Sequence, residues 1–159
     1  MKGVEVGKKR NIAVVGNHAA GKTTLIEAIL YHTGAIDRLG RIDDGNTFAD
    51  YLEEEKDRKI TISSKLLQCN FKGHHINLID TPGYTDFIGD ILGSLRAADV
   101  ALVVINAQSG VEVETEKIWE FLEEYEIPRV VVMNRMDKEH ADFDKSLQNL
   151  ESVLGAQVC

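Results

Sequence analysis

The chain contains 159 residues, of which 43% are hydrophobic and 28% are charged, and its formal net charge at pH 7 is −8. This length suits one domain with a substantial core and is too short for two domains of ordinary size. The acidic balance argues against a broad basic face for binding nucleic acid. No apolar stretch is long enough to span a membrane, and the polar residues 1–10 are not followed by an apolar core. We therefore expect a cytoplasmic protein without membrane contact.

The two cysteines, Cys69 and Cys159, lie far apart in the sequence. Their spacing is not that of a metal site, and a disulfide framework is not expected in a domain of this size with so few cysteines. We therefore expect Cys69 to be a small core residue in a strand and Cys159 to be an incidental terminal thiol.

A strand, a glycine-bounded loop and a helix open the chain. The apolar run from Ile12 to Val15 predicts a buried strand, and apolar residues at positions 25, 26, 29 and 30 predict a helix from about Lys22 to His32. The loop between them has the pattern of a phosphate-binding loop in its required strand–loop–helix setting. The residues that we predict to contact phosphates are Gly16, Asn17, His18, Ala19, Ala20, Gly21, Lys22, Thr23 and Thr24.

The chemistry of this loop follows from its residue types. Gly16 and Gly21 permit turns that aim backbone N–H groups inward, and the start of the helix adds partial positive charge. Lys22 supplies a charge for the outer phosphates, and the Thr23 hydroxyl is placed to bind Mg²⁺. We expect His18 to contribute only its backbone N–H. A glycine-rich turn without any ligand is the alternative, which this setting disfavours.

Residues 34–59 form a long connection that is rich in Asp, Glu and Gly. Phe48, Tyr51 and Leu52 have the spacing of a short amphipathic helix, with glutamates 53–55 on its solvent side. A connection this long indicates a functional or mobile segment. The alternative is a solvated acidic insertion, which is our interpretation of the acidic residues themselves.

The rest of the chain alternates strands with helices. Lys65 to Phe71 and His75 to Ile79 predict a hairpin around the turn 72–74. The next predicted element is a helix with Phe87, Ile91, Leu92 and Leu95 on one face, and a buried strand at 100–105 follows it. After these come a helix ending before Pro128, a second fully buried strand at 130–133, and a last helix at about 142–154. This order predicts an open, mostly parallel sheet with helices on both faces and an antiparallel edge hairpin.

Two further strings stand where strands of this sheet end, so we expect them on the same rim as the phosphate loop. Asp80-Thr81-Pro82-Gly83 offers a carboxylate for Mg²⁺ and its water shell, and a glycine N–H for a terminal phosphate. In the string Asn134-Arg135-Met136-Asp137, the carboxylate can accept two hydrogen bonds from guanine that adenine cannot donate. Ordinary turn chemistry would explain each string alone, but not their placement beside the phosphate loop.

Together these strings resemble the signature motifs of the translational GTPases. The three strings look like the first, third and fourth motifs, and Arg58-Lys59-Ile60-Thr61-Ile62 looks like the second, a switch segment. The resemblance covers roughly Arg10 to Lys138 and is strongest to elongation factor G and its elongation factor G-like paralogues. It implies a P-loop, Ras-like G domain over residues 1–159, with switch-like segments at 34–61 and 80–96.

The resemblance also implies a function. It predicts a Mg²⁺-dependent GTPase that binds GTP and GDP and acts on the ribosome in translation. Thr61 would reach Mg²⁺ when GTP is bound, together with Thr23 and Asp80, and would be released after hydrolysis. The predicted catalytic residues are Lys22, Thr61, Gly83 and Tyr84.

Several positions depart from the family pattern. Tyr84 stands where most members have a histidine that orients the attacking water, so hydrolysis is expected to be slow or altered. Ala19 replaces an acidic residue, which argues against a monovalent-cation site. Lys59 replaces a glycine. Arg135 replaces a lysine but keeps a long apolar stem that can lie along the guanine ring, so this change is mild. Because the chain stops at Cys159, we expect the N-terminal part of a larger protein that lacks the last strand of the G domain here.

Three alternatives remain at this point. One is a GTP-binding sensor that hardly hydrolyses because of Tyr84. Another is a ribosome-protection or release-type factor, whose first domain would look much the same. The third is a P-loop phosphotransferase for a small molecule, although Thr61 would have no role in it.

Overall fold

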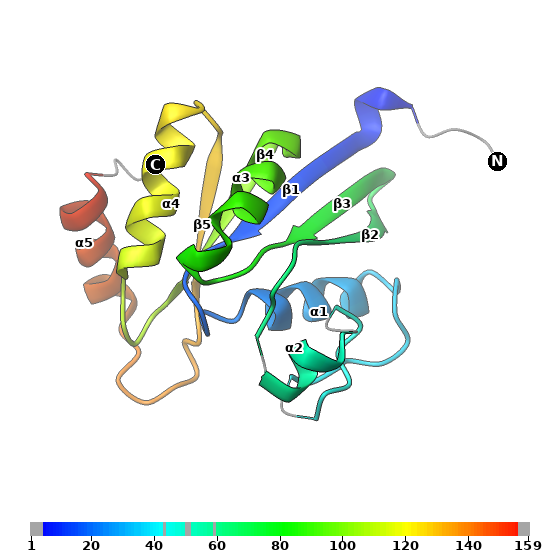
Figure 1. Ribbon diagram of the computed structural model, residues 1–159, viewed down its shortest axis with the longest axis horizontal. Coiled ribbons are helices and arrows are strands. Elements are labelled where there is room, and N and C mark those ends of the chain that lie inside the picture. The colour runs from blue at the N-terminus through cyan, green and yellow to red at the C-terminus, as the bar shows by residue number, and fades with distance from the viewer. Residues whose placement is uncertain (1–4, 43, 50–51, 59, 156–159) are drawn as a thin grey trace.

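The computed structural model describes residues 5–42, 44–49, 52–58 and 60–155 (Figure 1). The strands are β1 (Lys9–Val15), β2 (Lys65–Phe71), β3 (His74–Asp80), β4 (Val100–Asn106) and β5 (Arg129–Asn134). The helices are α1 (Lys22–His32), α2 (Glu53–Arg58), α3 (Ile88–Ala97), α4 (Val113–Glu124) and α5 (Phe143–Leu154), with short 3₁₀ turns at Val6–Lys8 and Thr85–Phe87. The predicted alternation of strands and helices is confirmed, and α1 has the predicted bounds.

The strands form one sheet in the order β2-β3-β1-β4-β5. β1 runs parallel to β3 and β4, β5 runs parallel to β4, and β2 alone is antiparallel to its neighbour β3. The β2–β3 hairpin turns through Lys72 and Gly73, whose φ angles of 47° and 76° suit the tight turns that join twisted strands. The four parallel strands end at one rim, which is where the predicted site residues follow them in the sequence.

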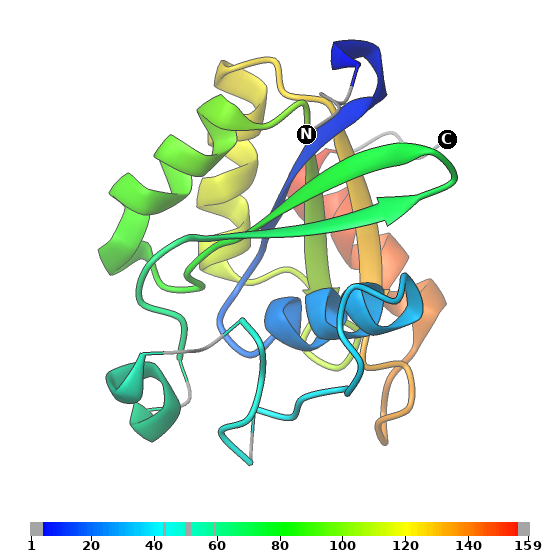
Figure 2. The ribbon, with the colours of Figure 1, turned by 90° about the vertical axis from the view of Figure 1, so that its right-hand side faces the viewer.

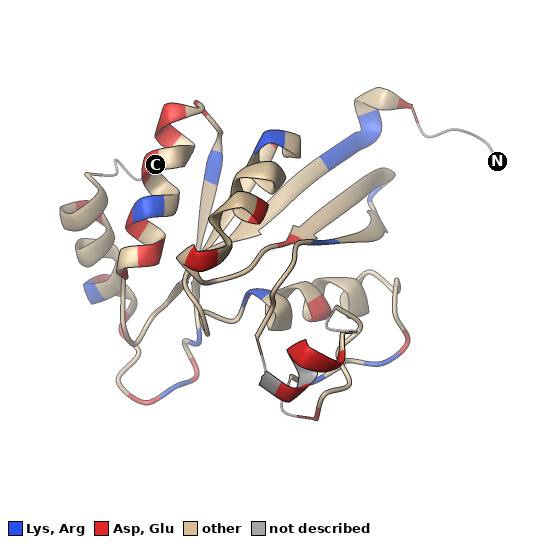
Figure 3. Cartoon of the chain, in the orientation of Figure 1, with Lys and Arg blue, Asp and Glu red and all other residues tan. Residues whose placement is uncertain are grey.

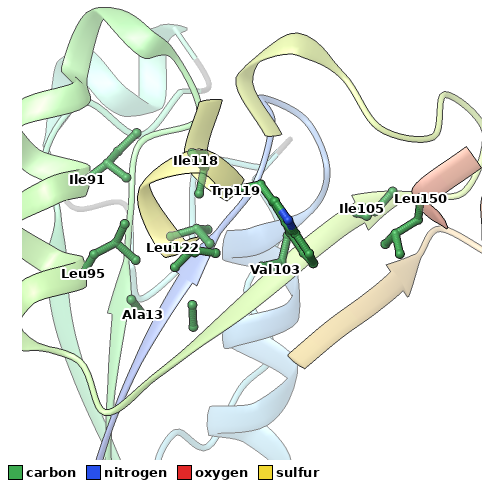
Figure 4. Packing of buried hydrophobic residues seen from close by; sticks show 11 residues of the cluster. Ala13, Ile91, Leu95, Val103, Ile105, Ile118, Trp119, Leu122 and Leu150 are labelled. Atoms are coloured by element: carbon green, nitrogen blue, oxygen red, sulfur yellow. The ribbon is translucent and has the colours of Figure 1, made fainter. Parts of the chain in front are cut away.

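Helices cover both faces of the sheet because successive residues of β1 point in opposite directions. Ala13 and Val15 pack with buried residues of α3, α4 and α5 (Figure 4). Val14 packs in a second cluster that contains Ile26 of α1. Each fully buried aliphatic side chain in these clusters contributes about 1.5–3 kcal/mol of transfer free energy. The two clusters therefore stabilise both faces of the sheet whose strand ends form the rim.

Trp119 and Cys69 both lie in these clusters. Trp119 is 6% exposed and belongs to the cluster shown in Figure 4. Cys69 is 2% exposed and belongs to the cluster on the α1 side, as expected for a small core residue. Cys159 lies outside the described residues.

The strand β5 departs from the prediction of a fully buried strand. Val130 is 55% exposed, and the other residues of β5 are half-buried. The reason is position, because β5 is the edge of the sheet among the described residues and packs against only one neighbouring strand, β4. An apolar run therefore predicted the strand correctly and its burial wrongly.

The segment before β2 also differs from the prediction. The helix α2 begins at Glu53, so Phe48 lies outside it and is 62% exposed, while Tyr51 lies outside the described residues. Acidic residues do cluster on α2 (Figure 3), but of its three glutamates only Glu53 and Glu54 are exposed. Glu55 is 1% exposed, so its predicted place on the solvent side is wrong.

Candidate nucleotide site at the rim of the sheet

The phosphate loop, residues 16–24, leads from the end of β1 into α1 (Figure 1). Gly16, Ala19 and Gly21 have φ angles of 139°, 59° and 93°, in the region that favours glycine. A Cβ on Gly16 would collide with the carbonyl oxygen of Val104 on β4, so the loop can pass this close to the sheet only because the residue is glycine. The loop thus brings the start of α1, with its unpaired N–H groups, to the rim.

Lys22 is the first residue of α1 and its side chain is folded back into the loop. Its ammonium group donates hydrogen bonds to the carbonyl oxygens of Gly16, at 3.0 Å, and Asn17, at 2.9 Å. The residue is 6% exposed. Burial lowers the pKa of Lys22 to about 8, and the nearby carboxylate of Asp80 opposes that shift. A buried cation that donates to two carbonyl oxygens of the loop suits an anionic ligand.

The three predicted metal ligands meet beside Lys22. The Thr23 hydroxyl donates to Oδ2 of Asp80 at 2.9 Å, and it lies 3.3 Å from the hydroxyl of Thr61. Asp80 is fully buried at the end of β3, and Thr61 comes from the long segment before β2. The structure therefore brings oxygen atoms from three distant parts of the chain into one cluster.

Gly83 and Tyr84 follow Asp80 and lie against the phosphate loop. A Cβ on Gly83 would be 2.6 Å from the Lys22 ammonium and 2.7 Å from the backbone nitrogen of His18, so only glycine allows this approach. The Tyr84 ring stacks on the His18 ring, with 4.3 Å between centroids and 19° between planes. Burial lowers the pKa of His18, and the charges of Lys22 and Arg135 lower it further, while the charges of Glu112 and Glu114 oppose this shift.

The residues predicted to read the base approach the loop from the other side. The Asn134 side-chain amide donates to the carbonyl oxygen of Ala20 at 2.8 Å, and a Cβ on Gly21 would collide with that amide. Arg135 has a φ angle of 61° and lines the same cavity as Lys22. The Asp137 side chain is 74% exposed and lies 3.4 Å from the Lys138 ammonium. Asn134 and Arg135 are thus part of the cluster, whereas Asp137 extends from its margin into solvent.

A cavity of about 120 Å³ joins these groups. Its lining residues are His18, Ala19, Gly21, Lys22, Thr23, Ile42, Ile60, Thr61, Gly83 and Arg135. The lining combines the phosphate loop, the switch-like segment, the Asp80–Gly83 string and the base-reading string. Ile42 was not singled out from the sequence, and Ile60 was named there only as part of the switch string that contains Thr61.

Buried charges around the switch-like segment were also missed. Glu27 of α1 accepts hydrogen bonds from the backbone N–H groups of Gly40, Phe48 and Ala49. Its position could have been found, since Glu27 follows Thr23 by four residues and precedes Leu30 by three, on the buried face of α1. Glu55 gave no such signal, because it sits within a run of glutamates.

Two wider properties belong to the part of the chain that the structure describes. It contains no group of three or more His, Cys, Asp or Glu side chains that could hold a metal ion by themselves. Among the same residues, none of the helices has both the length and the apolar composition of a membrane span.

A mostly parallel sheet whose phosphate loop meets Asp80 and Asn134 at one rim defines the G domain of the P-loop GTPases. Residues 7–158 match the family described as the elongation factor Tu GTP binding domain, and the chain belongs to this family. The predicted fold class is therefore confirmed.

Relatives within the family are more specific. The chain is 44% identical over 153 residues to elongation factor G of Fervidobacterium nodosum, and 43% identical over 143 residues to elongation factor G 2 of Borreliella afzelii. These matches cover 96% and 90% of this chain, but 22% and 21% of the relatives. A crystal structure of a protein from Thermus thermophilus matches with a TM-score of 0.88 and 45% identity, over 92% of this chain and 22% of that one.

These similarities confirm the resemblance to elongation factor G that the motifs indicated. The sensor and the ribosome-protection or release-type factor are not favoured by them. The chain spans about a fifth of the length of the relatives that it matches.

Proposed function

We propose that this chain binds GTP and GDP, hydrolyses GTP, and serves as the nucleotide switch of an elongation factor G-like protein. The observation that carries the proposal is the convergence of Thr23, Thr61 and Asp80 beside a phosphate loop that Asn134 also contacts. Four signature strings that are far apart in the sequence thereby share one cavity. Neither a bare turn nor a small-molecule phosphotransferase requires the switch threonine at this place.

Phosphate binding is assigned to the loop and to Lys22. The backbone N–H groups of residues 16–24 and the start of α1 face the anion, and the helix dipole adds to their attraction. Lys22 exchanges its bonds to Gly16 and Asn17 for bonds to the outer phosphate oxygens. The N–H of Gly83 contacts the terminal phosphate, since Gly83 already lies beside the Lys22 ammonium.

The cluster of Thr23, Thr61 and Asp80 fits Mg²⁺. Two hydroxyls and one carboxylate are hard oxygen donors, and Mg²⁺ in phosphate sites is held by one or two protein groups, by waters and by the substrate. When bound, the ion neutralises charge that develops on the phosphate oxygens. Thr61 reaches the cluster only when the 34–61 segment is closed, so this segment reports whether GTP or GDP is bound.

Guanine recognition is assigned to Asn134, Arg135 and Asp137. The Asn134 amide fixes the base-reading string to the phosphate loop, and the Arg135 stem lies along the base. The exposed carboxylate of Asp137 accepts hydrogen bonds from guanine N1–H and its exocyclic amine. Adenine leaves these acceptors without donors, so ATP binds much more weakly.

Tyr84 orients the water that attacks the γ-phosphate. A phenol is a weak base near neutral pH but can hold a water by a hydrogen bond, and phosphoryl transfer depends chiefly on positioning. The His18 ring supports the Tyr84 ring through their stacked contact. We expect hydrolysis by the protein alone to be slow and the ribosome to accelerate it. The ribosome is the partner implied by the elongation factor G relatives, and the expected location is the cytoplasm.

Calorimetry with GTP, GDP and ATP on the full chain tests the assignment of the base. We expect Asp137→Asn to weaken GDP binding by roughly tenfold or more, as for a lost hydrogen bond to a charged group. Glu139→Gln is the matched control, because Glu139 is also an exposed carboxylate, two residues further on. Equal affinities for ATP and GDP in the unmodified protein would contradict the assignment.

Single-turnover hydrolysis with and without ribosomes tests the switch. The ribosome is expected to raise the rate, and Tyr84→His is expected to raise it in both conditions. Tyr31→His, at an exposed tyrosine of α1, is the control for a nonspecific effect of the substitution. A rate that ribosomes leave unchanged would refute the proposed partner.

A further inference from the structure

A buried ion pair lies beside the nucleotide site but is no part of it. The Glu55 carboxylate is 2.5 Å from the Lys65 ammonium, and their side chains are 0% and 2% exposed. Removing two charges from water is costly, and an apolar pair of similar volume is often as stable. The pair therefore calls for an explanation other than stability.

Glu55 holds the backbone on both sides of Thr61. Its side-chain Oε1 accepts the N–H of Ile62 at 2.9 Å and that of Ser63 at 3.5 Å. Its backbone carbonyl oxygen accepts the N–H of Ile60 at 3.2 Å. Thr61 is thus bracketed by bonds to a single residue, and its hydroxyl faces Thr23 at 3.3 Å.

Lys65 ties this arrangement to the sheet. It is the first residue of β2 and stands opposite Asp80 of β3 in the antiparallel register. Lys65, Leu67 and Cys69 alternate on the buried face of β2, so the ammonium points to the same side as the core cluster around α1. Figures 1 and 2 show α2 close to the chain that enters β2. The strand that carries Lys65 is also paired to the strand that carries Asp80.

We propose that Glu55 and Lys65 are positioning residues that set Thr61 in the geometry for GTP and its Mg²⁺. This inference rests on the proposed function, in which Thr61 contacts the GTP-bound site and is released with GDP. Lys65 fixes the Glu55 carboxylate to the sheet, Glu55 fixes residues 60–63, and those residues place the Thr61 hydroxyl beside Thr23. Neither Glu55 nor Lys65 lines the cavity, so the ion pair acts only through Thr61.

A positioning role predicts a selective effect on affinity. Lys65→Met leaves the Glu55 carboxylate buried without its cation, which drives Glu55 toward solvent and releases residues 60–63. The affinity for a non-hydrolysable GTP analogue in the presence of Mg²⁺ should fall by roughly tenfold or more, the scale of one lost hydrogen bond to a charged group. The affinity for GDP should change by less than about twofold, since Thr61 is not engaged in that state.

The experiment measures both affinities for the full chain by fluorescence with labelled nucleotides. The variants are Lys65→Met, Glu55→Gln and Thr61→Ala, together with Lys65→Met combined with Thr61→Ala. Glu54→Gln is the matched control, because it removes an exposed carboxylate from the same helix. Glu55→Gln keeps an oxygen acceptor for Ile62 and gives a milder test should Lys65→Met fail to fold.

The double variant separates positioning from general stability. If Lys65 acts through Thr61, Lys65→Met has no further effect on the GTP analogue once Thr61 is alanine. An equal loss of both nucleotides in Lys65→Met and Glu55→Gln, or a full additional loss in the double variant, would overturn the inference while leaving the proposed function intact. An unchanged GTP analogue affinity in Thr61→Ala would overturn the role of Thr61 itself, and with it this inference.

Discussion

Replacing Glu27 by leucine should loosen the first half of the switch-like segment without unfolding the domain. Glu27 is fully buried in α1, and its carboxylate accepts the N–H groups of Phe48 at 2.6 Å, Ala49 at 3.0 Å and Gly40 at 3.2 Å. Leucine fills a similar volume but offers no acceptor. Glutamine keeps one oxygen for the two shorter bonds and turns an amide donor toward the third.

The magnitude follows from these three bonds. A hydrogen bond to a charged group is worth about 1.5–3 kcal/mol, and a buried donor left without a partner costs about 1–3 kcal/mol. Three such donors would cost roughly 3–9 kcal/mol if they stayed buried, against a total stability of roughly 5–15 kcal/mol. The segment is therefore expected to open to water locally, which limits the global loss to about 1–3 kcal/mol.

Hydrogen exchange and urea unfolding of the nucleotide-free protein measure the two effects. In Glu27→Leu we expect the protection of the Gly40, Phe48 and Ala49 amides to fall by roughly a hundredfold, with a smaller loss in Glu27→Gln. Glu151→Leu, at an exposed position of α5, controls for the change of residue type. Unchanged protection of these amides in Glu27→Leu, or an equal loss in Glu27→Leu and Glu27→Gln, would refute the role of the Glu27 carboxylate as their acceptor.

Three further predictions concern the cavity itself. Burial lowers the pKa of Lys22 from 10.5 to about 8, so between these pH values the folded protein releases a proton that the unfolded chain still binds. The free energy of unfolding should therefore rise by about 3 kcal/mol from pH 8 to 10.5. Urea titrations measure this rise, which should be absent in Lys22→Met. His18→Ala removes the ring that stacks on Tyr84, so it should slow single-turnover hydrolysis with little change in GTP affinity. His18→Phe keeps an aromatic ring and should restore the rate. A slow His18→Phe variant would contradict the role of the His18 ring in positioning Tyr84. Gly21→Ala should weaken GDP binding by roughly tenfold or more, because the new Cβ would collide with the Asn134 amide and an alanine is strained at a φ of 93°. Calorimetry measures this affinity. Unaltered binding would show that the loop can change its conformation without loss of affinity.

Local chemistry was sufficient for most of the fold and for the strings at its rim. The apolar run before Gly16 and the helical spacing after Lys22 predicted the strand–loop–helix unit, and the hairpin turn at 72–74 predicted the antiparallel edge. These patterns extend over only a few residues, so they can be interpreted without knowing how the rest of the chain folds. The rule that parallel strands end at one rim then brought Asp80 and Asn134 to the phosphate loop.

Burial and long-range contacts required the tertiary structure. Glu55 and its neighbour Glu54 are the same residue type in one acidic run, yet one is buried against Lys65 and the other is exposed. The stack of His18 on Tyr84, and the exposure of Val130 on an edge strand, likewise depend on which segments meet across the sheet. Residue type and spacing determined which elements form and which residues can bind a nucleotide. The packing of distant segments decided which charges leave water and hold the switch threonine, because the free energy of a buried charge depends on the partners that surround it.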